Sequence, residues 1–471
     1  MNNIPQKHQD VFKIISEAAQ ELDCPVYVVG GYVRDFYLNR LKEGEIDIDF
    51  VTVGSGIKLA QKVSKKLKGS SLAVYKQFGT AQVKDGELEL EFVGARKESY
   101  RKNSRKPLVE DGTLEDDQLR RDLTINALSW SLNKKDYGKL KDPFDGMKDL
   151  ENGIIRTPID PHQTYDDDPL RMMRAIRFAA QLDFRIEEKT FEAIEMMSPR
   201  INIISKERII DELNKIILSG NTSLGFTMLF KTGLLKEFFP EMHALHGVKE
   251  VNGISHKDNL WHTLKVLDNI IELGADLWLR WAAIMHDIAK PPTQRFQEGI
   301  GWTFHGHDAL GAKWTKQIFR RLGLPLDERM RYVQKLVRLH LRPIALVSDE
   351  VSDSAIRRLI YEAGDDIDDL MKLCRADITT KNDYKQVKYQ QNFDYVEQRI
   401  KEVEEKDRIR NWKNPLSGDE IMEALNIKPS KTVGVVKEAV KEAILNGDIP
   451  NDHDAAYNYM LEHKNDFINN V

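Results

Sequence analysis

The sequence contains little cysteine: its 471 residues include only Cys24 and Cys374. Two cysteines so far apart, without metal-site spacing, rule out a disulfide framework and a cysteine-based zinc site as organising features. Long apolar runs are also missing, and the N-terminus has no signal-peptide pattern. Because these patterns mark membrane and secreted proteins, we expect a cytoplasmic protein with no membrane partner.

The sequence also lacks an excess of basic residues, since 70 Lys and Arg stand against 75 Asp and Glu, for a net charge of −5. Such a chain does not coat nucleic acid non-specifically, although a local basic patch can still bind RNA. Its length exceeds the roughly 250–300 residues at which single hydrophobic cores stop growing. We therefore expect more than one domain.

Residues 26–53 are the most informative stretch, and they begin with the apolar, β-branched run 26–29. This run predicts a buried strand, and the glycines after it predict a tight turn into a helix from Tyr32 to Leu41. Bare backbone amides at such a turn, beside a helix N-terminus, form a generic phosphate site. A lone Gly-Gly pair is usually only a turn, so the next segment has to show whether this turn is a phosphate site.

Residues 46–53 predict a second strand in which apolar and acidic residues alternate, so that Asp47 and Asp49 share one face. Carboxylates at this spacing can share a divalent cation, and oxygen ligands suit Mg²⁺. Asp-x-Asp alone is usually a solvated strand edge. A phosphate site followed by a paired-Asp strand is, however, the minimum equipment for metal-assisted nucleotidyl transfer.

Two short motifs, GGYVRD at 30–35 and DIDF at 47–50, resemble the family of class II CCA-adding enzymes and bacterial poly(A) polymerases. The resemblance implies catalytic carboxylates that hold Mg²⁺, with a third acidic position on a later strand, predicted here at 88–93. It also implies phosphate anchors at the glycine turn. The residues at these positions are Asp47, Asp49 and Glu91 for catalysis and Gly30, Gly31 and Arg34 for phosphate.

Residues 96–106 carry six basic residues and one acid, and the small and polar residues among them predict a mobile loop. From charge alone, this is equally an ordinary solvated loop. Its position resembles the flexible loop of the family, which is associated with addition of the terminal A. The loop has its full length in this sequence.

Residues 119–129, LRRDLTINALS, match the family's RRDxxINA signature, which contacts the ribose and triphosphate of the incoming nucleotide. We expect the adjacent Arg120 and Arg121 to point in different directions. One would then reach the triphosphate while the other pairs with an acid such as Asp122. The signature implies that Arg120, Asp122 and Asn126 bind the nucleotide.

Residues 165–178, YDDDPLRMMRAIRF, predict a helix on which Asp168 and Arg171 share a face at i,i+3. A surface ion pair gives the same pattern. A carboxylate only accepts and a guanidinium only donates, so this pair fits the edges of cytosine and adenine but not those of guanine and uracil. The segment resembles the family's Glu-Asp-x-x-Arg motif, with Asp in place of Glu at its first position. The resemblance assigns nucleotide binding to Asp167, Asp168, Arg171, Arg174 and Arg177.

The sequence after about residue 160 shows no convincing strand pattern and predicts helices. A second metal site is suggested by a His-Asp pair on an apolar helix, with a His before it and an Asp after it. This order resembles the HD metal phosphohydrolases, although a single buried His is usually a core residue. It implies a transition-metal ion (Mn, Ni, Fe or Zn) held by His262, His286, Asp287 and Asp377, with His305, His307 and His340 lying between.

We therefore expect an α+β nucleotidyltransferase head with a small mixed sheet (1–155), then an all-α neck (156–225), HD body (226–395) and tail (396–471). The resemblance implies untemplated addition of CCA to tRNA from CTP and ATP, by a monomer or homodimer. It also implies that the HD body hydrolyses 2′,3′-cyclic phosphate or 2′-phosphate at nucleotide ends. An A-adding enzyme, a poly(A) polymerase, or an HD phosphohydrolase with an RNA-binding head remain alternatives.

Overall fold

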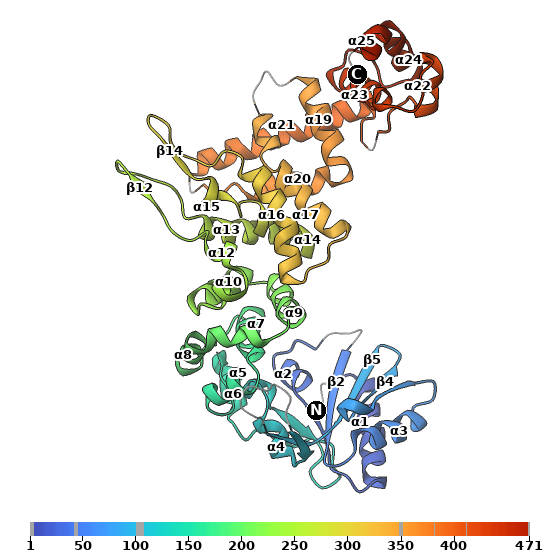
Figure 1. Cartoon of the computed structure of the whole chain (residues 1–471). Helices are drawn as coiled ribbons and strands as arrows, with labels where there is room; N and C mark the ends of the chain where they lie inside the picture. Colours follow the sequence, from blue (N-terminus) through green and yellow to red (C-terminus); the bar gives the residue numbers. More distant parts are fainter. Residues whose placement is uncertain are drawn as a thin grey trace. The chain divides into compact units, whose positions relative to one another are not determined.

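The computed structural model describes residues 4–41, 46–99, 108–347, 352–380, 382–410 and 412–469. The chain divides into two compact units, Met1–Phe238 and Phe239–Val471. Figure 1 traces both, and each is described here by itself.

The first unit begins with the predicted α+β head, and its elements follow the order expected from the hydrophobic patterns. They are α1 (Gln6–Glu21), β1 (Val26–Val29), α2 (Gly31–Tyr37), β2 (Ile46–Thr52), α3 (Gly56–Lys66), β3 (Ser71–Tyr75), η1 (Lys76–Phe78), β4 (Thr80–Asp85), β5 (Leu88–Gly94), β6 (Arg96–Ser99), β7 (Leu108–Asp111), α4 (Leu114–Leu119), η2 (Thr124–Asn126), β8 (Ser129–Ser131), β9 (Leu140–Lys141) and α5 (Gly146–Asn152).

The head contains a seven-stranded sheet in the order β3-β4-β5-β2-β1-β8-β9. Only the central pair, β2 and β5, is parallel, and the other neighbours are antiparallel, which makes the sheet mixed. One face is apolar: Phe50 of β2 stacks on Phe92 of β5 and meets Phe12 of α1 edge to face. Helices α1 and α3 lie together beside these strands (Figure 1). The acidic residues of β2 and β5 alternate with the apolar ones and therefore lie on the opposite face.

Two local predictions in the head are corrected. The helix predicted from Tyr32 to Leu41 ends at Tyr37, and the chain turns at Asn39, which has a φ of 52°. Part of the predicted loop at 96–106 is a strand, because β6 pairs with β7 in antiparallel register from Arg96 to Ser99. The rest of that loop, from residue 100 onward, lies outside the described residues.

Helices fill the rest of the first unit, apart from one short parallel strand pair. The elements are β10 (Ile154–Ile155), α6 (Pro161–Asp167), α7 (Leu170–Leu182), β11 (Arg185–Ile186), α8 (Glu188–Met197), η3 (Ser198–Ile203), α9 (Lys206–Ile217), α10 (Thr222–Lys231) and α11 (Leu234–Phe238). The apolar residues of α9 lie along one face and are buried, and α9 packs against α7. This packing supports the helix on which several predicted arginines lie.

The second unit is a helical body with two small hairpins. Its elements are α12 (Pro240–His243), β12 (Glu250–Val251), β13 (Ile254–Ser255), α13 (Asn259–Glu272), α14 (Leu277–Met285), α15 (Lys290–Thr293), β14 (Arg295–Gln297), β15 (Gly301–Thr303), α16 (His307–Leu322), α17 (Glu328–Leu339), α18 (Arg342–Ala345), α19 (Asp353–Ala363), η4 (Gly364–Asp366), α20 (Ile367–Ala376), α21 (Asp383–Asp407), α22 (Gly418–Leu425), α23 (Lys431–Asn446), α24 (His453–Glu462) and α25 (Lys464–Asn469).

Strand β11 and the two hairpins depart from the prediction that only helices follow residue 160. Their strands have two or three residues each, too few to show an alternating pattern. Asn252 and Gly253 turn the first hairpin with φ values of 54° and 74°, as a tight two-residue turn requires. This Asn-Gly pair was a sequence signal that could have located it. Among the described helices, none is long and apolar enough to cross a membrane.

Candidate active sites

The acidic face of the sheet brings the three predicted catalytic carboxylates together. Strands β2 and β5 run parallel, and their register sets Asp49 opposite Glu91. Asp47 lies two residues away on the same face, while Ile48 between the two aspartates is fully buried on the other. Three carboxylates on adjacent strands form the kind of oxygen-only site that suits a divalent cation.

The pKa values of two of these carboxyl groups show how crowded the negative charges are. Loss of surrounding water raises the pKa of Glu91, and the neighbouring Asp49 and Asp47 raise it further. The pKa of Asp49 is also raised, because the same loss of water outweighs the attraction of Arg121 and because Asp47 adds repulsion. Asp49 nevertheless keeps solvent-exposed surface. A divalent cation at this cluster would relieve the repulsion, so the residues present fit such an ion.

The glycine turn lies directly beside the acidic face, because β1 pairs with β2 so that Val29 is opposite Asp49. Gly30 has a φ of 74°, and a Cβ at this position would lie 3.0 Å from Arg121 Nη1 and 3.7 Å from Asp49 Oδ2. The positive φ therefore disfavours a side chain at this position, and a Cβ would also crowd the Arg121 guanidinium. One part of the prediction is wrong: the N–H of Gly30 is not bare, since it donates to Leu128 O at 3.1 Å. Gly31, as the first residue of α2, keeps an N–H without an intrahelical partner.

Both arginines of the RRD segment bind one carboxylate, which differs from the prediction that they point in different directions. Arg120 donates to Oδ1 of Asp117 from Nε at 3.0 Å, and Arg121 donates to Oδ2 from Nε at 3.1 Å and from Nη2 at 3.0 Å. Burial alone would raise the pKa of Asp117, but the two guanidiniums outweigh it and lower that pKa. Asp117, which the sequence analysis missed, thus holds both guanidiniums in place.

Arg121 was also missed as a site residue. Its Nη1 donates to Asn126 O at 3.3 Å and is the atom nearest to the space where a Gly30 side chain would be. This guanidinium therefore lies beside the glycine turn and close enough to Asp49 to attract its charge. A cation in that position is suited to contact phosphate oxygens. The RRD sequence alone does not show which of its two arginines lies beside the glycine turn.

Asp122 pairs with Arg174, not with an arginine of the RRD segment. Its Oδ2 accepts from Arg174 Nε at 2.6 Å, and its Oδ1 accepts from the Asn126 side chain at 3.0 Å. Asn126 in turn accepts from Arg34 Nη1 at 2.7 Å. Burial would raise the pKa of Asp122, but Arg174 and the Asn126 hydrogen bond lower it to about 2. This chain of contacts links α2, the RRD segment and α7.

The predicted base-reading pair does not lie on one face of a helix. Asp168 is in extended conformation between α6 and α7, and its Oδ1 accepts from the N–H of Leu170 at 3.1 Å. The proline that follows Asp168 disfavours helical backbone at this position, which explains the break. Its Oδ2 is 2.8 Å from Arg208 Nη2.

Arg171 lies on α7, and its guanidinium donates to two backbone carbonyls, at 3.3 Å to Thr164 O and 2.6 Å to Arg120 O. Among the described residues, no hydrogen bond or ion pair joins the side chains of Arg171 and Asp168. Asp167, the residue before Asp168, is the last residue of α6 and is half-buried. Both members of the predicted pair thus have other partners here.

The remaining predicted arginines surround one aromatic ring. The guanidinium carbons of Arg34, Arg174 and Arg177 lie 4.8, 5.6 and 4.0 Å from the centre of the Phe178 ring. Arg177 is buried, and its Nε donates to Glu212 of α9 at 2.6 Å. This ion pair ties α7 to α9, so Arg177 has a structural partner in addition to its predicted role.

The HD residues converge in the second unit on both oxygens of Asp287. His262 Nε2 and His286 Nε2 lie 3.4 and 3.2 Å from Asp287 Oδ2. Asp377 Oδ1 completes this side, at 2.8 Å from His262 Nε2. On the other oxygen, Oδ1, His307 Nε2 and His340 Nε2 lie at 3.3 and 3.9 Å. Asp287 therefore bridges two groups of candidate metal ligands.

The orientation of the histidine rings shows why this cluster fits metal ions. His286, His307 and His340 each place Nδ1 2.7 Å from a backbone carbonyl oxygen, which can only accept, so Nδ1 carries the proton. Nε2 is then the nitrogen that would bind a metal ion, and in each ring it is directed at a carboxylate or at another ring nitrogen. The nearby Asp287 overcomes the effect of burial and raises the pKa of His286 to about 10. In metal sites, the histidine ligands typically donate their other ring N–H to a backbone carbonyl in this way, which fixes the orientation of the ring.

Two of the six residues in the cluster were not among the predicted ligands. His307 opens α16 and His340 follows α17, and only the packing of these helices brings their Nε2 atoms within 3.3 Å of each other. His305, which was named beside them, is exposed and outside the ligand groups found in the described residues. Lys290 Nζ lies 2.5 Å from Asp287 Oδ2 and is a cation already at the cluster.

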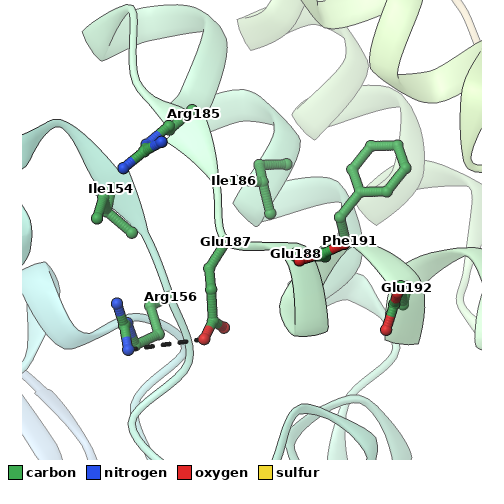
Figure 2. A pocket seen from close by; sticks show the side chains of 8 residues that line it. All are labelled: Ile154, Arg156, Arg185, Ile186, Glu187, Glu188, Phe191 and Glu192. Carbon is green, nitrogen blue, oxygen red and sulfur yellow. Dashed lines mark ion pairs between the residues drawn. The ribbon is translucent and has the colours of Figure 1, made fainter.

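A cavity of about 540 Å³ in the first unit lies away from the predicted sites. Figure 2 shows that it is lined by β10, β11 and the start of α8, with Arg156 directed toward Glu187. Arg156 Nη1 and Glu187 Oε1 are 3.6 Å apart. Its lining, as far as the chain is described, includes none of the predicted site residues, so we assign it no function.

Comparisons with known proteins match three family models along the chain. The Poly A polymerase head domain matches residues 26–156, the Probable RNA and SrmB- binding site of polymerase A matches 183–245, and the HD domain matches 260–379. The head match contains the acidic face and the glycine turn, and the HD match contains all six residues around Asp287. Nucleotidyltransferase and HD domains both use divalent metal ions, as the two clusters indicate.

The chain is similar to curated relatives over nearly its whole length. It is 30% identical to the A-adding tRNA nucleotidyltransferase of Deinococcus radiodurans, over 91% of this chain and 93% of that protein. It is 29% identical to the CC-adding tRNA nucleotidyltransferase of Thermus thermophilus, over 92% and 94%. Its fold resembles the Thermotoga maritima CCA-adding enzyme complexed with tRNA, with a TM-score of 0.60 and 22% identity over 98% and 96% of the two chains.

Proposed function

The chain belongs to the family of CCA-adding tRNA nucleotidyltransferases and poly(A) polymerases, and from this membership we propose that it builds CCA on the 3′ end of tRNA from CTP and ATP. The observation that carries the proposal is the acidic face beside the glycine turn. Asp47, Asp49 and Glu91 share that face, and Gly30 and Arg121 lie at its edge. Since tRNA would be the substrate, we infer that the enzyme acts in the cytoplasm.

We propose that Asp47, Asp49 and Glu91 hold Mg²⁺. When bound there, the ion would supply charge neutralisation for the triphosphate and a lowered pKa for the primer hydroxyl. The chain itself supplies the rest: the N–H of Gly31 and the guanidiniums of Arg34 and Arg121 are the donors for phosphate oxygens. Arg120, Asp122 and Asn126 keep the RRD segment in place and remain our proposed contacts for the sugar and triphosphate.

Base selection is proposed for Asp168 and Arg171, on the hydrogen-bond complementarity that the sequence suggested. Since Asp168 is paired with Arg208 in this structure, base reading requires that its carboxylate exchange this partner for the N–H₂ group of cytosine or adenine. We expect Asp168→Ala to lose discrimination against UTP and GTP. Asp166→Ala is the matched control, because Asp166 is an exposed acid two residues earlier in the chain.

An extension assay tests the main proposal. The purified protein is given Mg²⁺ and tRNA transcripts that end before CCA, after C and after CC, with each nucleoside triphosphate alone and with all four together. Stepwise addition that stops at CCA is expected. A single A added only to the CC transcript would identify an A-adding enzyme, and long A tails a poly(A) polymerase.

Variants separate the chemistry of the head from mere RNA binding. Asp47→Ala/Asp49→Ala should abolish extension. Glu91→Gln should raise the Mg²⁺ concentration needed for half-maximal extension several-fold, whereas Glu89→Gln should not, because Glu89 already pairs with Lys84 at 2.9 Å. Unchanged Mg²⁺ dependence in Glu91→Gln would remove Glu91 from the proposed metal ligands.

A second activity is favoured by the six-residue cluster around Asp287. We propose that the HD body binds Mn²⁺, Ni²⁺, Fe²⁺ or Zn²⁺ and hydrolyses phosphate esters at nucleotide ends, cyclic 2′,3′-phosphates and 2′-phosphates among them. In the hydrolysis of a monoester, oxygen of water bonds to phosphorus, the P–O bond to the ribose breaks, and the ribose oxygen takes up a proton. Release of inorganic phosphate from 2′-nucleotides, retained in Asp47→Ala/Asp49→Ala and lost in Asp287→Ala, is the test.

A further inference from the structure

A cavity of about 530 Å³ borders the HD cluster, and its lining includes the ligands His262 and Asp377. Its volume falls within the range typical of small-molecule sites. Much of the remaining lining comes from α21, which packs beside α20 (Figure 1). Anything that fills this cavity therefore lies next to the metal-ligating residues.

The α21 residues of the lining form one stripe along that helix. Lys385, Tyr389, Asn392 and Phe393 are spaced i, i+4, i+7 and i+8, which places them on a single helix face. At 1.5 Å per residue the stripe extends about 12 Å. The ammonium group of Lys385 therefore lies at one end of the stripe. The rings of Tyr389 and Phe393 follow along the helix, and the amide of Asn392 lies between these two positions in the sequence.

The charge of the lining favours an anionic ligand. Lys385 and Lys257 both line the cavity, and neither forms an ion pair with any residue that the structure describes. Two ammonium groups without carboxylate partners, beside a cluster built to hold metal cations, are suited to phosphate oxygens. A phosphate ester satisfies this requirement.

The aromatic and amide groups favour a flat, polar ring in the rest of the cavity. Phe393 is almost fully buried, while Tyr389 is 38% exposed and offers its ring to a ligand. Asn392 is half-buried, and within the described residues its amide has no hydrogen-bond partner. An aromatic surface with an adjacent amide, which both donates and accepts, is suited to stacking a nucleobase and bonding to its edge.

We propose that this cavity binds the base and ribose of a nucleoside phosphate whose phosphate group lies at the HD cluster, an inference that rests on the hydrolase function proposed above. Tyr389 stacks on the base, Asn392 bonds to its edge, and Lys385 and Lys257 contact the phosphate. The HD body then acts on a single terminal nucleotide and distinguishes it from phosphate esters that have no base.

The test compares substrates with and without a base. The Mn²⁺-loaded full-length protein is assayed on adenosine 2′-, 3′- and 5′-monophosphates and on β-glycerophosphate. We expect Tyr389→Ala to raise KM for the adenosine phosphates about tenfold or more and to leave β-glycerophosphate hydrolysis unchanged. Tyr389→Phe should keep the wild-type KM. Tyr384→Ala is the matched control, because Tyr384 lies on the same helix, is 78% exposed and does not line the cavity.

The outcomes separate the cavity from the hydrolase. If Tyr389→Ala and Asn392→Ala change neither KM, or change both substrates equally, the nucleotide cavity is refuted while the hydrolase stands. If no phosphate ester is hydrolysed, the hydrolase fails, and the cavity is tested by ³¹P NMR line broadening of adenosine 2′-monophosphate by Mn²⁺. That measurement uses the Asp47→Ala/Asp49→Ala protein, which removes two carboxylates from the head site. Broadening that Tyr389→Ala abolishes supports the cavity, and absence of broadening overturns it.

Discussion

Asp117 gives the sharpest test of how the head is organised, because a single buried carboxylate holds two guanidiniums. Its side chain is fully buried, while those of Arg120 and Arg121 are 22% and 18% exposed. In Asp117→Asn, the one remaining oxygen can accept from one arginine, and the amide N–H₂ meets the donors of the other. The variant therefore loses one side of the fork and the charge of the whole group.

The magnitude follows from the hydrogen bonds that are lost. A hydrogen bond to a charged group contributes about 1.5–3 kcal/mol, and two of them are removed on one side of the fork. Partial exposure of the arginines lets water replace part of this, so we expect a loss of about 3 kcal/mol. That energy corresponds to about a 100-fold change in an equilibrium constant or a rate.

Two measurements check this prediction. Hydrogen exchange followed by mass spectrometry should show exchange about 100-fold faster in peptides that cover α4 and the RRD segment. The kcat/KM for CTP should fall by a similar factor, because Arg121 no longer keeps its position beside Gly30. Glu115→Gln, an exposed acid in the same helix, is the control. Wild-type exchange and wild-type kcat/KM in Asp117→Asn would refute the reasoning.

Three further predictions concern single features of the two sites. Gly30→Ala should abolish extension, because the new Cβ would lie 3.0 Å from Arg121 Nη1. Gly69→Ala is the control, since Gly69 has a φ of 89° with open space around it and its substitution should lower stability only. Equal loss of extension in both variants would contradict the steric argument. Asp287→Ala should lose the metal bound to the second unit, measured by plasma mass spectrometry, and keep tRNA extension, so that full metal retention would exclude Asp287 as a bridging ligand. The pKa of Asp122 is about 2 in the fold against a usual 3.8, because Arg174 and the Asn126 hydrogen bond outweigh burial. The ionised Asp122 carboxylate therefore contributes about 2 kcal/mol of stability above pH 3.8, which is lost as the pH falls toward 2. Arg174→Gln should remove this acid-dependent step from hydrogen-exchange profiles of α7.

The strands that carry the catalytic carboxylates were predictable because their pattern is local. Alternation along 46–53 and 88–93 placed Asp47, Asp49 and Glu91 on polar faces, and the structure confirms those faces. The prediction needed only the two-residue period of a strand. The parallel pairing that brings the strands together was not part of the pattern.

Partner choice could not be predicted, because it depends on which segments pack together. The RRD segment contains two arginines followed by Asp122, and the sequence predicted that one of these arginines pairs with an acid such as Asp122. In the structure both arginines pair with Asp117, while Asp122 pairs with Arg174 from α7. An i,i+3 spacing suggested a helical face at 168–171, but the proline after Asp168 breaks the helix. That proline was a readable signal, and it outweighed the spacing.

The HD cluster shows the same division between local and distant information. The His-Asp pair was recognisable because its two residues are adjacent after an apolar run. The structure corrects the expected helical position, since α14 ends at Met285, His286 caps it and Asp287 lies in the following turn. His340 has no acidic neighbour, and the Asp308 that follows His307 pairs with Arg338 and stays outside the cluster. Both histidines enter the cluster through the packing of α16 on α17. Their Nδ1 bonds to backbone carbonyls then fix which ring nitrogen faces Asp287. No sequence pattern encodes this last step.

The two clusters are each complete within one compact unit, and this makes their chemistry separable. All the head residues discussed lie within Met1–Phe238, and the six residues around Asp287 lie within Phe239–Val471. Because the two sites have no residue in common, we predict that substitutions in one act independently of the other. Asp47→Ala/Asp49→Ala and Asp287→Ala should therefore each remove one activity and retain the other, and the triple variant should show the sum. If Asp287→Ala also slowed extension, the two units would have to exchange free energy, and the assignment of one reaction to each would have to be replaced by a coupled mechanism.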